Sequence, residues 1–393
     1  MKVALLSLLF LGTLTIGTSM VRADDERKFE VYGFAHFDYI QDFNRVDPAW
    51  AATLRPSKIP TADGTFGSDG QAILSARQSR LGVQANLPTD MGAVFTKFEF
   101  DMFGVGVDAG QTTIRLRHAY GQWGHWLAGQ TNSLFMDGDV FPNTVDYWGP
   151  CGMVFLRNPQ LRFTTSSSDS RTFALAIEHP SNDVDAGELR NVDPSLANTV
   201  SQSKVPDVTA QVRFGQSWGH VQIAGIVRKL GYETIGGPNS APKGSKLGGG
   251  VDVTSNVKMG EKDVLHLGVV AGKGIANYMN DGGTDLAADG TLTRPEAAAV
   301  PLLGMIAYFD HYWSERFSSS IGYSRTEVDN ADLQTDAAFR TGQYASGNLL
   351  YYPTKNVFMG GEVLWGQRED NGGDTGEDWR FQFSVHYGFS ALD

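Results

Sequence analysis

The sequence predicts an all-β fold, a single 16-stranded antiparallel transmembrane β-barrel with an infolded constriction loop. Three observations favour this fold. Segments in which apolar and polar residues alternate recur sixteen times. Long and short connections between them take turns along the chain, as in a barrel with loops at one rim and tight turns at the other. Tryptophan and tyrosine collect beside the short turns, which is typical of an aromatic girdle at a membrane interface.

The first 23 residues read as a signal peptide rather than as part of the fold. Lys2 precedes an apolar stretch over residues 3–16, and Val21-Arg22-Ala23 supplies the small residues that signal peptidase requires. The apolar stretch is too short for a transmembrane anchor. We therefore expect cleavage after Ala23, export, and a single barrel domain over residues 24–393.

The alternating segments give the strands. In one of them, Lys97, Glu99 and Asp101 alternate with Phe98 and Phe100. Strands are expected near residues 28–42, 72–87, 93–104, 111–122, 125–132, 155–166, 171–179, 207–216, 219–232, 246–257, 263–276, 300–312, 315–328, 341–352, 356–368 and 378–389. The number is even, and the sheet has to close because lipid offers no partners to the backbone groups of an open edge.

The connections support the same topology. Long ones are expected near 43–71, 105–110, 133–154, 180–206, 233–245, 277–299, 329–340 and 369–377. The short ones are LPTDMG, WGH, SSSDS, QSWGH, KMGEKD, YWSER and YPTKN. A soluble β-sandwich has no reason to alternate long and short connections through the whole chain.

Charge and cysteine content exclude several classes of function. Without Lys2 and Arg22, 30 of the 32 basic residues remain against 44 acidic ones, a net charge of −14. This argues against a nucleic-acid partner. Cys151 is the only cysteine, so an intrachain disulfide and a cysteine-rich metal framework are excluded. We expect neither a cofactor nor a metal.

The long segment at about 133–159 is the expected constriction loop. It is too apolar and aromatic to lie in water, and its large apolar residues are Phe135, Phe141, Tyr147, Trp148, Met153 and Phe155. Folded into the barrel, the loop would present Asp137, Asp139 and Asp146 to the lumen, with Pro142 and Pro150 fixing its turns.

A basic cluster is expected on the wall opposite this loop. On strand parity, the residues that face the lumen are Arg80, Arg115, Arg117, Arg162 and Arg213, whereas Arg77 has the wrong parity unless a bulge resets it. On the strand of Arg115, the residues expected to face lipid are Ile114, Leu116 and Tyr120. Guanidinium groups match carboxylates and stay charged at any relevant pH, so such a cluster would favour anions. The alternative is that these arginines pair with Glu99, Asp101 or Glu178 and only support the wall.

Four stretches carry a family resemblance: SARQSRLGVQANLPTDMG, KFEFDMFGVGVDAGQTTIRLRHAYGQW, GQTNSLFMD and FPNTVDYWGPCGM. Together they resemble the DcaP-like porins of Gram-negative outer membranes, most specifically over residues 30–165. The resemblance implies a homotrimer of sixteen-stranded barrels in the outer membrane, in contact with lipid and lipopolysaccharide. It also implies passive passage of small anions, notably dicarboxylates and aromatic acids.

Two other classes of protein remain open at this point. An outer-membrane barrel enzyme of the lipase or protease type would need a catalytic group, and His118, His125 and His311 lie near strand ends. None of them belongs to an HExxH metal motif. A soluble secreted β-rich protein that binds glycans is the second alternative, and purification without detergent would indicate it.

Overall fold

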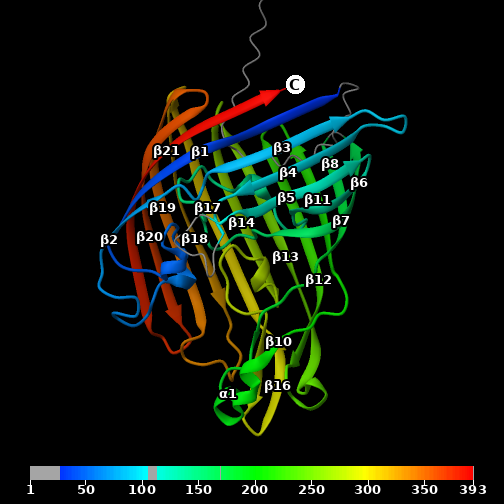
Figure 1. The fold of residues 1–393 in the computed structure, drawn as a ribbon, viewed down its shortest axis with the longest axis vertical. Helices are drawn as coiled ribbons and strands as arrows, with labels where there is room; N and C mark the ends of the chain where they lie inside the picture. Colours follow the sequence, from blue (N-terminus) through cyan, green and yellow to red (C-terminus); the bar gives the residue numbers. More distant parts are fainter. Residues whose placement is uncertain (1–26, 105–112, 169, 393) are drawn as a thin grey trace, which may run out of the picture.

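The computed structural model describes residues 27–104, 113–168 and 170–392. The predicted signal peptide (1–23) and the predicted loop at 105–110 therefore lie outside the described residues. The described chain forms a closed antiparallel barrel, which confirms the predicted fold (Figure 1).

Sixteen strands build the wall, one of them in two pieces. The first eight are β1 (Lys28–Asp42), β2 with β3 (Gln71–Ser75 and Arg80–Leu87), β4 (Val94–Asp101), β5 (Arg115–Trp123), β6 (Trp126–Asn132), β7 (Arg157–Ser168), β8 (Arg171–Glu178) and β11 (Asp207–Gln216). The other eight are β12 (Gly219–Thr234), β13 (Lys243–Met259), β14 (Asp263–Lys273), β17 (Pro301–Ser314), β18 (Phe317–Val328), β19 (Phe339–Thr354), β20 (Val357–Asp370) and β21 (Thr375–Leu392).

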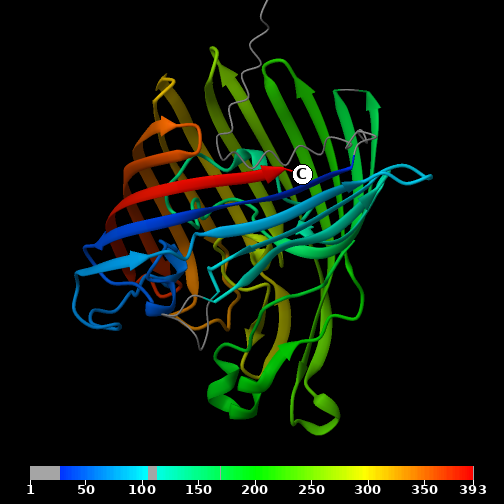
Figure 2. The same ribbon diagram turned by 45° about the horizontal axis from the view of Figure 1, so that its top comes forward.

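The barrel closes where its first and last strands meet. β1 and β21 pair antiparallel from Glu30↔Leu392 to Asp42↔Arg380, and they lie side by side in Figures 1 and 2. The opposite edge of β1 is occupied by β2 and β3. No edge of the wall is left open at this seam, as a sheet in lipid requires.

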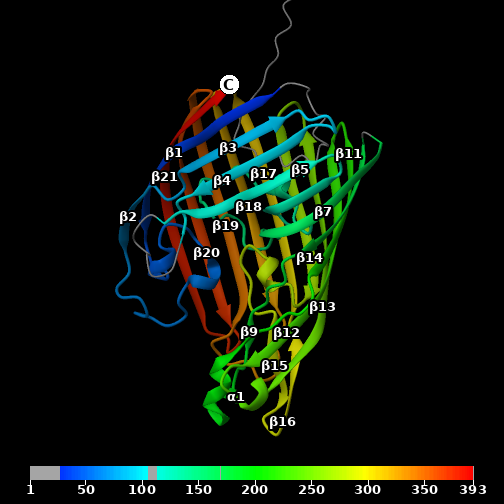
Figure 3. The ribbon, with the colours of Figure 1, turned by 45° about the vertical axis from the view of Figure 1, so that its right-hand side comes forward.

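The long connections form a second layer of structure at one end of the barrel. β12 and β13 project beyond the rim together with a small sheet of β9 (Val184–Asp185), β15 (Leu286–Thr291) and β16 (Arg294–Ala299), as Figure 3 shows. Beside them lie β10 (Thr199–Ser201), α1 (Leu189–Val192) and η4 (Pro194–Asn198); the other single turns are η1 (Pro48–Trp50), η2 (Pro56–Lys58), η3 (Gly138–Val140), η5 (Pro238–Ser240) and η6 (Ala276–Tyr278). Within the described ranges, no helix is long and apolar enough to cross a membrane.

The two faces of the wall have opposite polarity. On β11, Thr209 and Gln211 are buried toward the interior, while Val208 is exposed on the outside. On β18, Ser324 is buried and Ile321 is exposed. In water this arrangement would be unfavourable, but it is the arrangement that lipid around a polar interior stabilises.

Two irregularities change which side chains face inward. Arg117 has no partner on β4, because Glu99 pairs with His118 and Phe100 with Leu116. This bulge places Tyr120 opposite Lys97, on the inner face, so the prediction that Tyr120 faces lipid is wrong. Between β2 and β3, four residues (76–79) lie opposite three of β1, which resets the parity around Arg77.

One predicted long loop is a tight turn. β20 ends at Asp370 and β21 begins at Thr375, so only residues 371–374 connect them. The strands continue into the acidic, glycine-rich sequence because backbone pairs such as Glu369↔Thr375 extend the ladder beyond the apolar residues.

Candidate functional site

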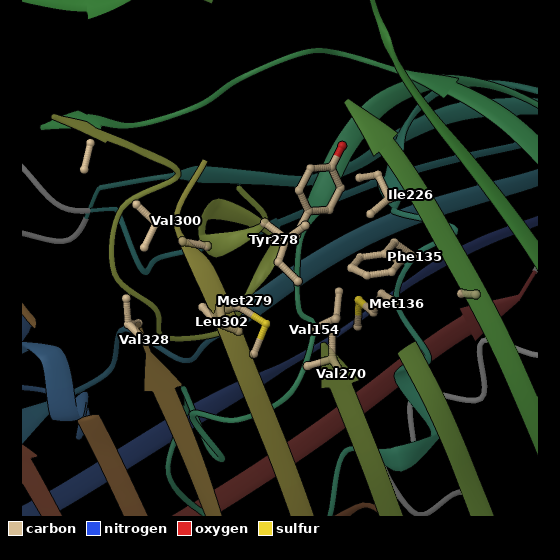
Figure 4. Close-up of a cluster of buried hydrophobic side chains, with 14 residues drawn as sticks. Phe135, Met136, Val154, Ile226, Val270, Tyr278, Met279, Val300, Leu302 and Val328 are labelled. Carbon is tan, nitrogen blue, oxygen red and sulfur yellow. The ribbon is translucent and has the colours of Figure 1, made fainter. Parts of the chain in front are cut away.

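The segment between β6 and β7, residues 133–156, lies inside the barrel. Phe135, Met136 and Val154 from this loop belong to a buried apolar cluster with Tyr278 and Met279 of the 274–300 connection (Figure 4). Figure 4 also shows wall residues that complete the cluster, including Ile226, Val270, Leu302 and Val328. The loop folds inward because burying these apolar side chains is favourable, whereas exposing them to water would lose that hydrophobic stabilisation.

The first half of the loop is bound to the wall by carboxylates. Asp137 accepts hydrogen bonds from Arg213 (3.2 Å), Thr254 (2.7 Å) and the backbone amide of Asp139 (3.1 Å), and it also contacts His220 Nε2 (2.6 Å). Asp139 forms a second ion pair with Arg213. The ligand atoms of Asp137, Asp139 and His220 lie within 4.8 Å of one another, and Arg213 forms an ion pair with each of the two carboxylates. We interpret this group as the anchor of the loop.

The second half of the loop is bound by Glu362 and by the first long connection. The backbone amides of Val145 and Asp146 donate to Glu362 at 2.9 and 3.0 Å. The Asp146 carboxylate accepts from Thr53 Oγ1 (2.7 Å) and Tyr344 OH (3.2 Å). Burial raises the pKa of Asp146, while the hydrogen bonds from Thr53 and from backbone amides oppose the shift. Asp137 and Asp146 are each 2 % exposed, so they face the wall and a neighbouring loop rather than an open lumen.

The end of the loop fits closely against β17 and β18. A Cβ on Gly152 would lie 2.3 Å from the carbonyl oxygens of both Met305 and Arg325, so only glycine allows this approach. The neighbouring Cys151 is fully buried, and its amide donates to Ser324 Oγ at 3.0 Å.

The predicted arginines separate into two groups. Arg77, Arg80, Arg115 and Arg117 gather around Glu99 and Asp101 of β4. Arg162 and Arg213 lie elsewhere, on a small cavity that Asn132 and Gln222 also line. Arg162 donates to Gln160 Oε1 and to the carbonyl of Asn132, so its contacts hold the stem of the loop.

Arg115 and Arg117 differ in exposure. Arg117 donates to Glu99 (2.7 Å), Asp101 (2.9 Å) and Tyr147 OH (2.9 Å), and it is 2 % exposed. These contacts match the alternative in which an arginine supports the wall. Arg115 binds Asp101 through two hydrogen bonds of 3.1 and 2.8 Å, yet 28 % of its side chain is exposed. It therefore remains accessible to a solute.

Arg77, Arg80 and Lys97 complete the cluster on the wall. Arg80 and Lys97 share Glu99 at 3.6 and 3.5 Å. Arg77 lies over the ring of Phe103, 4.5 Å from its centroid, and donates to the carbonyl of Gly104. The Nε atoms of Arg77 and Arg80 are buried and have no acceptor among the described residues.

Arg157 joins this cluster, although parity with Arg162 predicts that it points away. The β5–β6 ladder ends at Ala119↔Gln130, whereas the β6–β7 ladder continues to Asn132↔Arg157. The end of this hairpin therefore leaves the wall, and Arg157 comes within electrostatic range of Arg80, Arg115 and Arg117. Its Nε and Nη2 atoms are buried without an acceptor in the described parts of the chain.

The cluster carries an excess of positive charge. Its six cationic side chains are Arg77, Arg80, Lys97, Arg115, Arg117 and Arg157, and they share the two carboxylates of Glu99 and Asp101. Four positive charges are therefore left without a carboxylate in this cluster. We call these eight residues the basic cluster.

Aromatic rings and a further arginine extend the basic cluster toward the first long connection. The Arg115 guanidinium lies 5.1 Å from the Tyr147 ring centroid. Arg55 lies between Trp50 (4.2 Å) and Trp148 (4.4 Å) and forms an ion pair with Asp281 at 2.8 Å. Sequence parity could not place Arg55 here, because it lies in a connection and not in a strand.

A buried arginine holds the 274–300 connection inside the barrel. Arg228 of β12 donates to Asp207 (2.9 Å) and Asp285 (3.1 Å), and its guanidinium lies 4.8 Å from the Tyr278 ring centroid. Tyr278 in turn donates to Asp207 at 3.0 Å. We call Arg228, Asp207, Asp285 and Tyr278 the loop latch.

One short stretch has the spacing of a catalytic motif without its structure. GQSWG at 215–219 matches G-x-S-x-G, which in hydrolases forms a turn from a strand into a helix. Here it forms the tight turn between the antiparallel strands β11 and β12. Ser217 therefore does not lie in the strand-to-helix turn that exposes the nucleophilic serine of such hydrolases.

A polar-lined barrel of sixteen strands with an infolded loop defines a channel of the porin class. The chain matches the model of the DcaP outer membrane protein family over residues 12–389, and it belongs to that family. A comparison with curated proteins finds no match.

Solved structures with the same fold include three outer-membrane proteins. The DcaP channel of Acinetobacter baumannii is 22 % identical, with a TM-score of 0.78 over 92 % of this chain and 97 % of that one. An anion-selective porin from Comamonas acidovorans is 10 % identical, with a TM-score of 0.56 over 93 % and 100 %. The trimer form of OmpT from Vibrio cholerae is 11 % identical, with a TM-score of 0.52 over 92 % and 99 %.

Proposed function

We propose that this porin is a passive diffusion channel for small hydrophilic solutes that prefers anions, such as dicarboxylates and aromatic acids. The observation that carries the proposal is the excess of four positive charges in the basic cluster. Selectivity in a channel follows the local field at its narrow part rather than the net charge of the chain. The net charge of −14 for residues 24–393 therefore does not oppose an anion preference.

The geometry of the basic cluster fits planar carboxylates. Arg115, whose side chain is 28 % exposed, supplies N–H donors that a passing carboxylate can use. Trp50 and Trp148 beside Arg55 supply ring faces for the planar part of an aromatic acid. A carboxylate that passes along the basic cluster would accept hydrogen bonds from one arginine before it leaves the previous one.

The remaining parts of the proposal concern assembly and export. We propose that the chain is exported with cleavage after Ala23 and assembles as a homotrimer in the outer membrane, in contact with lipid and lipopolysaccharide. The family and the trimer form of the OmpT neighbour support this assembly. Insertion into a planar bilayer in three equal conductance steps is the expected signature.

Uptake into liposomes tests the solute preference. Swelling rates are compared for succinate, phthalate, a neutral sugar and a diamine, with the wild-type chain and with Arg115→Ser/Arg157→Ser. We expect the double variant to lower the swelling rates for both acids several-fold and to leave the rate for the sugar unchanged. The substitutions change the electrostatic field in the channel more than they change the channel's width. Arg117 is spared, because it is buried and its hydrogen bonds to Glu99, Asp101 and Tyr147 join the wall to the loop.

The control variant is Arg190→Ser, which removes one positive charge from an exposed ion pair with Asp185. It should match the wild type with all four solutes. An equal loss of acids and sugar in the double variant would show that the arginines only support the wall. Unchanged rates for the acids would show that they do not govern permeation.

A further inference from the structure

Two histidines face each other across the seam that closes the barrel. His36 on β1 and His386 on β21 are direct partners in the antiparallel register. Their Nδ1 atoms are 3.3 Å apart, and the two rings are nearly perpendicular at 78°. Direct cross-strand partners point to the same face of the sheet, so both imidazoles lie on the inner wall.

A buried carboxylate fixes the state of the first imidazole. His36 Nε2 lies 3.0 Å from Asp38 Oδ1, and Asp38 is fully buried. A neutral imidazole that donates a hydrogen bond from Nε2–H to a carboxylate has an unprotonated Nδ1, whose lone pair points away from that carboxylate. Asp38 is itself held by Gln382 (2.9 Å) and Ser384. In metal sites, a carboxylate bound to the other ring nitrogen orients the histidine toward the ion.

The distance between the nitrogens fits a shared metal ion. With metal–nitrogen bonds of about 2.0–2.1 Å and a tetrahedral angle, two ligand nitrogens are separated by about 3.3 Å. The separation of 3.3 Å between His36 and His386 agrees with this value. The same separation is long for a hydrogen bond, compared with about 2.9–3.0 Å for N–H···O. The geometry therefore fits a shared ion.

Two phenylalanine rings flank the second imidazole, and one arginine lies near the pair. His386 is half-buried and stacks on Phe358, with ring centroids 4.7 Å apart, while Phe34 covers its other flank at 4.3 Å. These rings limit rotation of the His386 side chain. The charged groups facing the pair are Asp38 and, within electrostatic range, Arg80. The carboxylate offsets the repulsion that Arg80 exerts on a dication.

We propose that His36 and His386 form a binding site for a transition-metal ion of the Zn²⁺, Ni²⁺ or Cu²⁺ class on the inner wall of the barrel. The two Nδ1 atoms supply two ligands, and water or a solute carboxylate takes the open positions. Imidazole is the ligand that these ions share, whereas Mg²⁺ and Ca²⁺ prefer oxygen. The sequence shows no motif for this site, because the two residues are 350 positions apart.

Titration calorimetry of the full-length mature chain in detergent, free of any histidine tag, tests the site with Ni²⁺ and Zn²⁺ alone. We expect one ion to bind per chain, and His386→Gln to weaken its affinity at least tenfold. Asp38→Asn keeps both ligands and should weaken the affinity by about 10- to 100-fold, because it removes the orienting carboxylate. His125→Gln, at an exposed turn, is the matched control and should bind like the wild type.

Absence of Ni²⁺ and Zn²⁺ binding up to millimolar concentration in the wild type would overturn the proposal. Equal affinity in His386→Gln and the wild type would do so as well. His386→Phe guards against a misfolded variant, since phenylalanine matches the neighbouring rings. If His386→Phe keeps the electrophoretic mobility of the folded, heat-stable barrel and still binds the ion like the wild type, the site lies elsewhere.

Discussion

Replacing Arg228 with methionine should release the 274–300 connection from the barrel interior. Arg228 is 1 % exposed and compensates the carboxylates of Asp207 and Asp285. Methionine keeps much of the side-chain volume but leaves both carboxylates buried without their cation. Removing one partner of a buried ion pair costs about 3–5 kcal/mol, more than the net stability the pair provides.

This cost translates into a measurable change in exposure. At 1.4 kcal/mol for each factor of ten, a loss of about 3–5 kcal/mol raises the population of the released connection by roughly two to three and a half orders of magnitude. Tyr278 is fully buried in the latched state and is a chymotrypsin site. Its cleavage rate tracks the released population when closing is faster than cleavage.

The assay compares chymotrypsin cleavage after Tyr278 in the wild type, Arg228→Met and Arg190→Met. Arg190 forms an exposed ion pair with Asp185, so its loss should cost at most about 1 kcal/mol and change cleavage less than tenfold. If cleavage in Arg228→Met also rises less than tenfold, the loop latch does not hold the connection in place.

Two further predictions follow from the buried side chains of the constriction loop. Cys151 is fully buried and burial raises the pKa of its thiol to about 12, so a maleimide at pH 8 should label it only after denaturation; labelling of the folded barrel would show that the loop is not docked. Phe135→Ala should lower the free energy of unfolding by about 3–5 kcal/mol in guanidinium titrations, because Phe135 is fully buried in the apolar cluster. Phe43→Ala, at a loop position that is 56 % exposed, should change it by about 0.5 kcal/mol or less; a comparable loss in both variants would contradict the packing argument.

The strands could be predicted because each one alternates between apolar residues, which face lipid, and polar residues, which face the interior of the barrel. Lys97, Glu99 and Asp101 share the inner face of β4, as the sequence indicates. Alternation cannot detect an extra residue, however. Because of the bulge at Arg117, Tyr120 lies on the inner face and not on the predicted outer face. The acidic sequence after Asp370 was interpreted as a long loop, although it forms a tight turn.

The candidate site was accessible to sequence reasoning only where it lies on regular strands. Arg80, Arg115 and Arg117 follow from parity. Arg55 and Arg157 do not, because one lies in a connection and the other on a hairpin end that departs from the wall. The seam between β1 and β21 joins residues at opposite ends of the chain, so no local pattern indicates that His36 meets His386.

The sign of the zero-current potential across a planar bilayer tests the central claim most directly. With a KCl gradient across the membrane, the excess positive charge of the basic cluster predicts a zero-current potential of the sign expected when chloride is more permeant than potassium. In Arg115→Ser/Arg157→Ser this potential should shift toward zero. A potential of the sign set by potassium in the wild type would contradict the claim that the basic cluster controls permeation.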